Sequence, residues 1–165
     1  MKTFKPKYLP QLNNNQSLKI IPLGGVGDVT KNMYIYEYGQ DIIIIDCGVG
    51  FPDEAMPGVD LVIPDISYLR DKINKIRAIL ITHGHEDHIG GLPYIWPQLQ
   101  VPIYAQRLTA GFIRAKFSEH NLPKNKIIEV GIDQRLDLGN FRISFYQVSH
   151  SVPDSTGIVL RTPQG

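Results

Sequence analysis

The sequence predicts an α+β fold in which helices are layered on β-sheet. The prediction rests on short β-rich runs, separated by Gly, Pro and Asp, that continue from residue 18 to the end of the chain. Segments with helical spacing of apolar residues are inserted between these runs, a mixture typical of sheet-and-helix layers. The composition agrees, because 42% of the 165 residues are hydrophobic and 20% are charged, which excludes intrinsic disorder.

The strands follow a leader, residues 1–17, that is polar, rich in Asn and Gln and expected to be flexible. In chain order, strands are predicted at residues 18–23, 32–38, 41–46, 77–82, 101–105, 126–130, 141–148 and 157–162. Gly39 and Gln40 predict a two-residue hairpin turn between the second and third strands. The run at 77–82 is expected to be buried because its central residues are all apolar.

Helices are predicted at residues 65–75, 88–99 and 108–120. Asp65 is the expected N-cap of the first helix. Pro93 and Pro97 are expected to break the second helix. The third helix is expected to carry three apolar residues largely on one side, namely Phe112, Ala115 and Phe117.

The end of the chain indicates a larger fold. The last predicted strand is followed by Pro163-Gln164-Gly165, a turn sequence, and no returning strand comes after it. A hairpin needs that second strand, so we interpret residues 18–165 as the N-terminal part of a domain that is cut inside its fold.

Charge and cysteine content exclude several classes of protein. The 17 basic and 16 acidic residues leave a net charge of +1, so no strong overall field attracts nucleic acid or membrane. The single cysteine excludes a disulfide framework and fits a reducing compartment. Unbroken apolar runs such as Ile42–Ile45 are far too short to cross a bilayer, and no apolar segment follows the basic start. We therefore expect a cytoplasmic protein with no membrane partner.

A histidine-rich segment at residues 82–91 carries the candidate chemistry. Three histidines and two carboxylates fall within six residues, directly after the buried strand. Imidazole and carboxylate together suit zinc, and also manganese or iron. His83 and His85 alternate along an extended backbone and so can point the same way, whereas Asp87 and His88 can face a second ion. A solvated loop that is merely rich in histidine is the alternative, although three of the five histidines are gathered here.

Other residues have weaker patterns. His150 follows the strand at 141–148 and is a ligand candidate, with an isolated strand-end histidine as the alternative. Cys47 is expected to be a small buried residue, and His120 to end a helix. Asp154 is expected to cap or close the turn after His150, and Asp60 is a candidate for an additional hard cation such as calcium. Residues 25–30 imitate a dinucleotide-binding loop, but the final glycine is missing and a strand follows.

The pattern HxHxDH after a buried strand resembles the metal-binding motif of the metallo-β-lactamase superfamily, whose members are di-metal hydrolases with an αββα sandwich. Further segments resemble the ribonuclease J family in order and spacing, namely Leu23–Gly27, Lys31–Met33, Ile45–Gly48, Phe51-Pro52, Gly58–Asp60, Val62–Asp65, His83–Gly91 and Ser149–Ser155. The resemblance implies the N-terminal half of such a sandwich, cut before the β-CASP domain that this family inserts.

The resemblance also implies roles for individual residues. His83, His85 and His150 would hold one metal, and Asp87 and His88 would hold the other and act through the metal-bound hydroxide. Asp46 would be an outer carboxylate that orients the ligands. The expected ions are two zinc ions, with manganese as the alternative.

The implied function is metal-dependent hydrolysis of RNA, both internally and from the 5′ end, by a protein that forms a homo-oligomer when full length. The family's bridging aspartate and final histidine would lie beyond Gly165, so we expect this chain alone to be inactive. One alternative is a di-metal hydrolase of a small ester, lactone or thioester, which has no reason to share Phe51-Pro52. Another is a non-catalytic remnant, which should have lost ligands, although all five are present.

Overall fold

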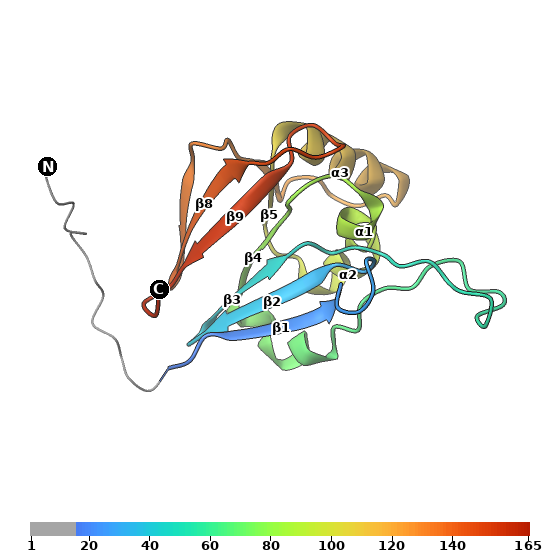
Figure 1. Ribbon diagram of the computed structural model, residues 1–165, viewed down its shortest axis with the longest axis horizontal. Helices are drawn as coiled ribbons and strands as arrows, with labels where there is room; N and C mark the ends of the chain where they lie inside the picture. Colours follow the sequence, from blue (N-terminus) through green and yellow to red (C-terminus); the bar gives the residue numbers. More distant parts are fainter. Residues whose placement is uncertain (1–15) are drawn as a thin grey trace, which may run out of the picture.

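The computed structural model describes residues 16–165, so only Gln16 and Ser17 of the predicted leader lie within the described part. Two β-sheets pack against each other, and helices cover the other face of the larger sheet (Figure 1). The predicted α+β architecture is therefore confirmed, with three layers in the order helices, large sheet and small sheet. Within residues 16–165, no helix is both long and apolar enough to cross a membrane.

The larger sheet has six strands in the order of the chain. They are β1 (Lys19–Gly24), β2 (Met33–Tyr38), β3 (Asp41–Ile45), β4 (Ile76–Leu80), β5 (Ile103–Ala105) and β6 (Ile127–Glu129). The first three strands pair antiparallel, whereas β3 to β6 pair parallel. Because the carboxyl ends of parallel strands meet at one edge, the loops after β3 and β4 are brought together there.

The smaller sheet contains β7 (Arg135–Leu138), β8 (Phe141–Gln147) and β9 (Thr156–Arg161), all antiparallel. The sequence analysis missed β7. Its four residues alternate between exposed and half-buried, and Gly139 turns the chain into β8 with a positive φ of 60°. The strand is too short, and too rich in charged residues, to stand out by β propensity.

Side chains of β3 point alternately to the two faces of the large sheet, so this one strand contributes to two hydrophobic cores. Ile42 and Ile44 pack with the helices, whereas Ile43 packs against the small sheet beside Phe141 and Ile143. All five side chains are buried, and each contributes about 1.5–3 kcal/mol on leaving water. The large sheet is therefore buried on both faces, which explains the near-continuous apolar runs of its central strands.

The helical segments differ from the predictions in detail. The segment predicted as a helix at 65–75 is a 3₁₀ helix, η1 (Ser67–Lys75), with Ile66 in the N-cap position. The Asp65 carboxylate still accepts a hydrogen bond from the Ser67 amide at 2.8 Å, so it closes the turn that leads into the helix. In α3 (Arg107–Glu119) the buried face is made by Thr109, Ala110, Ile113 and Phe117, and Phe112 and Ala115 are exposed, contrary to expectation.

The predicted broken helix consists of α1 (Glu86–Ile89) and α2 (Leu92–Leu99). The break falls at Gly90-Gly91 and not at the prolines. A Cβ atom on Gly91 would lie 2.6 Å from the carbonyl oxygen of Gly48, so only glycine fits this close approach. Pro93 is tolerated because it lies in the first turn of α2, where its missing N–H has no partner in the helix.

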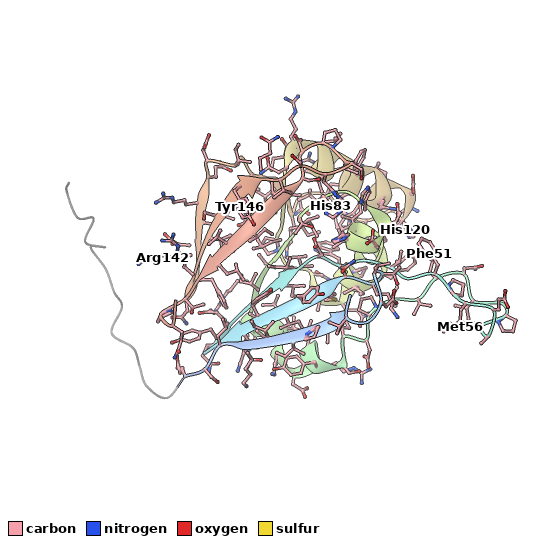
Figure 2. The ribbon with its side chains drawn as sticks, viewed as in Figure 1. Phe51, Met56, His83, His120, Arg142 and Tyr146 are labelled. Carbon is pink, nitrogen blue, oxygen red and sulfur yellow. The ribbon has the colours of Figure 1, made fainter. Side chains whose placement is uncertain are left out.

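The segment between β3 and η1 leaves the body of the protein. Figure 1 shows it extending away from the sheets, and Figure 2 shows Phe51 where it leaves the body and Met56 at its far end. An isolated bridge between Gly50 and Val62 joins its two sides. Asp60 lies exposed on this segment.

Asp41 ties the two sheets together although only 4% of its surface is exposed. Its carboxylate accepts hydrogen bonds from the backbone N and the Nδ2 of Asn140, at 2.8 and 2.7 Å, and pairs with Nε of Arg77 at 2.5 Å. Asn140 lies in the turn between β7 and β8, 99 residues further along the chain. A buried carboxylate is costly unless it is paired, and these partners compensate that cost.

Replacing Asp41 by Ala should lower the free energy of unfolding by about 1–3 kcal/mol, because the amide groups of Asn140 lose their acceptor. Urea unfolding followed by circular dichroism measures the change. The control is Asp137→Ala on the β7–β8 hairpin that carries Asn140. The Asp137 side chain is 81% exposed and lies 3.9 Å from Arg142. This control should change stability by less than about 0.5 kcal/mol. Equal effects of the two substitutions would contradict the predicted role of Asp41.

Candidate metal centre

Three chain segments meet at one edge of the large sheet. Asp46 directly follows β3, and its backbone N–H donates to the carbonyl oxygen of Leu80 in the neighbouring strand at 2.9 Å. The histidine-rich loop directly follows β4. The loop after β8 joins them, because Thr156 donates its N–H to the carbonyl oxygen of Thr82 at 2.9 Å. Parallel pairing of β3 with β4 and this third contact therefore assemble the site.

Three histidines converge at this edge. His83 Nε2 lies 3.0 Å from His85 Nδ1, and His150 Nε2 lies 3.1 and 3.2 Å from those two atoms. His83 is buried, His85 is half-buried and His150 is exposed. The three come from two loops that are 67 residues apart at their widest separation. Among residues 16–165 this is the one group of three or more potential ligands that lies close enough to hold an ion.

The three nitrogens fit a metal ion. Nitrogens bound to one tetrahedral zinc at ~2.05 Å would lie about 3.4 Å apart, close to the separations found here. A neutral imidazole offers one donor and one acceptor on different nitrogens, so three single nitrogens that face one another are not all satisfied by hydrogen bonds. A cation at their centre would satisfy all three. Imidazole donors suit zinc and also other first-row transition metals.

A second pair of ligand atoms lies beside the triad. Asp87 Oδ2 is 3.2 Å from His88 Nε2, and the rings of His83 and His88 are 4.0 Å apart. Asn32 Nδ2 donates to Asp87 Oδ2 at 3.0 Å and lies 3.3 Å from His88 Nε2. These two ligands are fewer than a closed site needs, so the pair would hold an ion only with further donors or water.

Asp46 lies behind the ligands. Its φ is 61°, in the left-handed region that non-glycine residues seldom adopt, and the residue is buried. One carboxylate oxygen accepts the Thr82 N–H at 2.8 Å, and the other lies 2.8 Å from His88 Nδ1. Bound in this way, His88 directs Nε2 toward Asp87. This is the geometry by which an outer carboxylate orients a ligand.

Thr82 has a role that the sequence analysis missed. Its hydroxyl donates to the Asp46 carboxylate at 2.8 Å and lies 2.9 Å from His83 Nδ1. The hydroxyl therefore turns the Nε2 of His83 toward the other histidines. The sequence offered one indication of this role: Thr82 is the last residue of the predicted strand and directly precedes His83. Asn32 was missed in the same way, because it lies 55 residues from Asp87.

Burial and neighbouring charge set the protonation of two histidines. Burial, helped by the charges of His88, His150 and His85, lowers the pKa of His83 to about 4. Burial alone would also lower the pKa of His88, but its hydrogen bond with Asp46 and the charges of Asp46 and Asp87 raise that pKa above its usual value. His83 is therefore a neutral imidazole near neutral pH, which is the form that binds metals.

The remaining candidates lie elsewhere. Cys47 is fully buried, and burial holds the pKa of its thiol well above the usual range, so it does not act as a nucleophile. His120 follows α3 as its C-cap, and its ring makes a T-shaped contact with Tyr94, outside the triad. Asp60 belongs to no cluster of potential ligands within the described residues, and calcium binding there stays a prediction. Asp154 bonds to Leu108 of α3 and not within its own turn.

Comparison with known proteins identifies the family. Residues 26–165 match the metallo-beta-lactamase superfamily. The chain belongs to this superfamily. Its similarity to ribonuclease J, expected from the motifs, is confirmed: it is 43% identical over 147 residues to ribonuclease J 1 of Streptococcus pyogenes. It is 44% identical over 156 residues to ribonuclease J of Thermus thermophilus.

These alignments cover 88% and 90% of this chain but 26% and 27% of the two relatives. The chain thus spans about a quarter of the length of the curated relatives it matches. Among solved structures, a protein of unknown function from Enterococcus faecalis aligns with a TM-score of 0.67 at 17% identity, over 89% of this chain and 41% of that one. The MIM-2 metallo-beta-lactamase aligns with a TM-score of 0.57 at 17% identity, over 81% of this chain and 52% of that one. The second alignment supports the metallo-beta-lactamase fold.

Replacing Thr82 by Val should weaken metal binding by about 10–100-fold, because His83 loses the hydroxyl that orients it while the shape of the side chain is kept. Zinc competition against a chromophoric chelator measures the affinity. The matched control is Thr109→Val in α3, since the Thr109 hydroxyl is buried without a partner. The control should bind zinc like the unchanged protein, and equal affinity of both variants would refute the orienting role.

The metal-free protein should lose stability as the pH falls from about 6.5 to about 4, in part through His83. The folded state keeps His83 unprotonated down to a pKa of about 4, whereas the unfolded state binds the proton below 6.5. Protonation therefore favours unfolding across this window. A His83→Gln variant should lose less stability than the unchanged protein between pH 7 and pH 4.5. Thermal unfolding in chelator at pH 7, 5.5 and 4.5 measures the difference. An identical pH dependence of the two proteins would contradict the lowered pKa.

Proposed function

We propose that this protein is a metal-dependent ribonuclease that hydrolyses RNA phosphodiester bonds. The observation that carries the proposal is the convergence of three imidazole nitrogens beside the Asp87–His88 pair. The 43–44% identity to ribonucleases J over about nine-tenths of the chain supports RNA as the substrate. The same centre would suit hydrolysis of a small ester, lactone or thioester, but the identity to named nucleases favours RNA.

In the proposed centre, His83, His85 and His150 hold one ion and Asp87 and His88 contribute to a second. Two such ions supply an activated water and stabilise the charge that develops on a phosphoryl oxygen. The protein fixes the donors: Asp46 orients His88, the Thr82 hydroxyl orients His83, and Asn32 holds the Asp87 carboxylate. The ligand atoms therefore need little rearrangement when an ion enters.

The finer features of the proposal follow the named relatives. Zinc is the proposed metal, with manganese as the alternative, and cleavage is proposed both internally and in the 5′ to 3′ direction. Residues 18–165 are proposed as the N-terminal part of a metallo-β-lactamase domain. The full-length protein is proposed to be a cytoplasmic homo-oligomer. These features are what the resemblance to the ribonuclease J family implies, and the two-ligand pair fits a site that receives further donors from other residues.

In the full-length gene product, His83→Ala should abolish RNA cleavage because the first ion loses a buried ligand. A fluorescently labelled 5′-monophosphorylated RNA in zinc or manganese is the substrate, and circular dichroism checks the fold. The control is His120→Ala, which removes an exposed histidine outside the triad. Near-normal cleavage by His83→Ala, with its fold retained, would show that the proposed centre is wrong.

The 165-residue chain alone should not cleave this RNA, because the second ion has only Asp87 and His88 among the described ligands. Two equivalents of zinc should not survive extensive dialysis of this chain for the same reason. Metal analysis and the cleavage assay test both expectations. Metal-dependent cleavage by the chain, removed by His83→Ala, would overturn the expected inactivity while supporting the site.

A further inference from the structure

The loop that carries His150 contains a residue in an unfavourable backbone conformation. Asp154 has a φ of 62°, in the left-handed region where glycine and asparagine are the easiest residues to accommodate. Glycine at this position would remove the strain without any side chain. Aspartate also adopts this conformation when its short side chain makes a hydrogen bond, so the partner of the Asp154 carboxylate is what matters.

The Asp154 side chain reaches a different element. Its Oδ2 accepts a hydrogen bond from the backbone N–H of Leu108 at 2.9 Å, across 46 residues of sequence. Leu108 lies in the first turn of α3, where the amide groups have no partners within the helix. The N-cap residue, Gln106, makes no capping hydrogen bond with its side chain, and the first turn contains no acidic residue. Asp154 therefore supplies the acceptor and the negative charge that the start of α3 lacks.

The same contact fixes the direction of the His150 loop. The base of the loop is closed by a hydrogen bond from Val148 N to Ser155 O at 3.1 Å. Between these residues, His150 is exposed, yet its Nε2 must lie within 3.1–3.2 Å of two other imidazole nitrogens. Asp154 directly precedes Ser155, so its contact with Leu108 attaches the C-terminal arm of the loop to a thirteen-residue helix. A loop that is closed at its base and attached to α3 by this arm holds His150 toward the other two histidines.

We propose that Asp154 is a positioning residue, which holds His150 at the metal centre by capping α3 from a separate loop. This inference rests on the metal centre proposed above. It adds a residue that touches neither ion nor substrate, and it gives α3 a function beyond covering the sheet. An outer contact of this kind is expected to change metal affinity by about tenfold or more when it is lost.

The decisive comparison is between two substitutions in the full-length protein. Asp154→Asn keeps an acceptor oxygen and tolerates the positive φ, so its zinc affinity should stay within about threefold of the unchanged protein. Asp154→Gly favours the backbone conformation but removes the acceptor, and its affinity should fall about tenfold. Affinities are measured by chelator competition. The matched control is Asn121→Gly, which relieves a φ of 54° just after α3 and should have no effect.

A double substitution tests whether the effect passes through His150. In a His150→Ala background, Asp154→Gly should cause no further loss of zinc affinity, because the ligand it positions is absent. If Asp154→Gly still lowers affinity tenfold there, or if it binds zinc like the unchanged protein, the positioning role is overturned. If His150→Ala alone leaves zinc affinity unchanged, the proposed ligand set fails, and the positioning role fails with it.

A second route removes the donor and leaves the carboxylate in place. Leu108→Pro deletes the N–H that Asp154 accepts, at an early helix position of the kind Pro93 occupies in α2. This variant should reproduce the tenfold loss of affinity even if Asp154→Gly proves too unstable to purify. Thermal unfolding in chelator verifies that each variant is folded before the affinity is measured. Unchanged zinc affinity of folded Leu108→Pro would overturn the inference.

Discussion

The site depends on the buried carboxylate of Asp46. It directly follows β3, at the edge where the parallel strands β3 and β4 end together, and it accepts the Thr82 N–H at 2.8 Å. Its other contacts, with the Thr82 hydroxyl and His88 Nδ1, extend from the same two oxygens to both groups of ligands. A charge in this position is costly unless every oxygen is paired, so the three partners are held as firmly as the carboxylate itself. The hydrogen bonds that compensate the buried Asp46 carboxylate therefore also fix the positions of the ligands.

The two proposed ion positions differ in the protonation of their ligands and in the number of ligand atoms. His83 is buried among other imidazoles and is a neutral imidazole at neutral pH, whereas the pKa of His88 is raised by its hydrogen bond with Asp46 and by the charges of Asp46 and Asp87. A metal ion at the triad would meet a neutral ligand, while an ion at the pair would compete with a proton for His88. The triad is also more complete, with three convergent nitrogens against two ligand atoms at the pair. Both differences favour binding of an ion at the triad before an ion binds at the Asp87–His88 pair.

Much of this arrangement could be predicted from the sequence, and the limits are physical. The strands were predicted by apolar runs such as Ile42–Ile45, and the loop ligands by the density of histidine after a buried strand. β7 was missed because four partly exposed residues bury too little surface to leave a pattern. Thr82, Asn32 and Asp154 were missed as orienting groups because their roles are hydrogen bonds to atoms brought close by folding. Periodicity reports which face is buried, but not which partner lies there.

The helix break at Gly90-Gly91 shows why local propensity misplaced one boundary. Pro93 is compatible with α2 because it lies in the first turn, and the helix also continues past Pro97 to Leu99. The chain turns at the glycines because the backbone of Cys47 and Gly48 presses against Gly91, and the Gly91 amide donates to the Cys47 carbonyl at 2.8 Å. Cys47 in turn donates to the carbonyl oxygen of His88 at 2.8 Å. The segment after β3 is thereby bonded both to α1, the short helix that carries Asp87 and His88, and to the turn that follows it. Close backbone packing, which only glycine permits, is therefore part of how the metal ligands are placed.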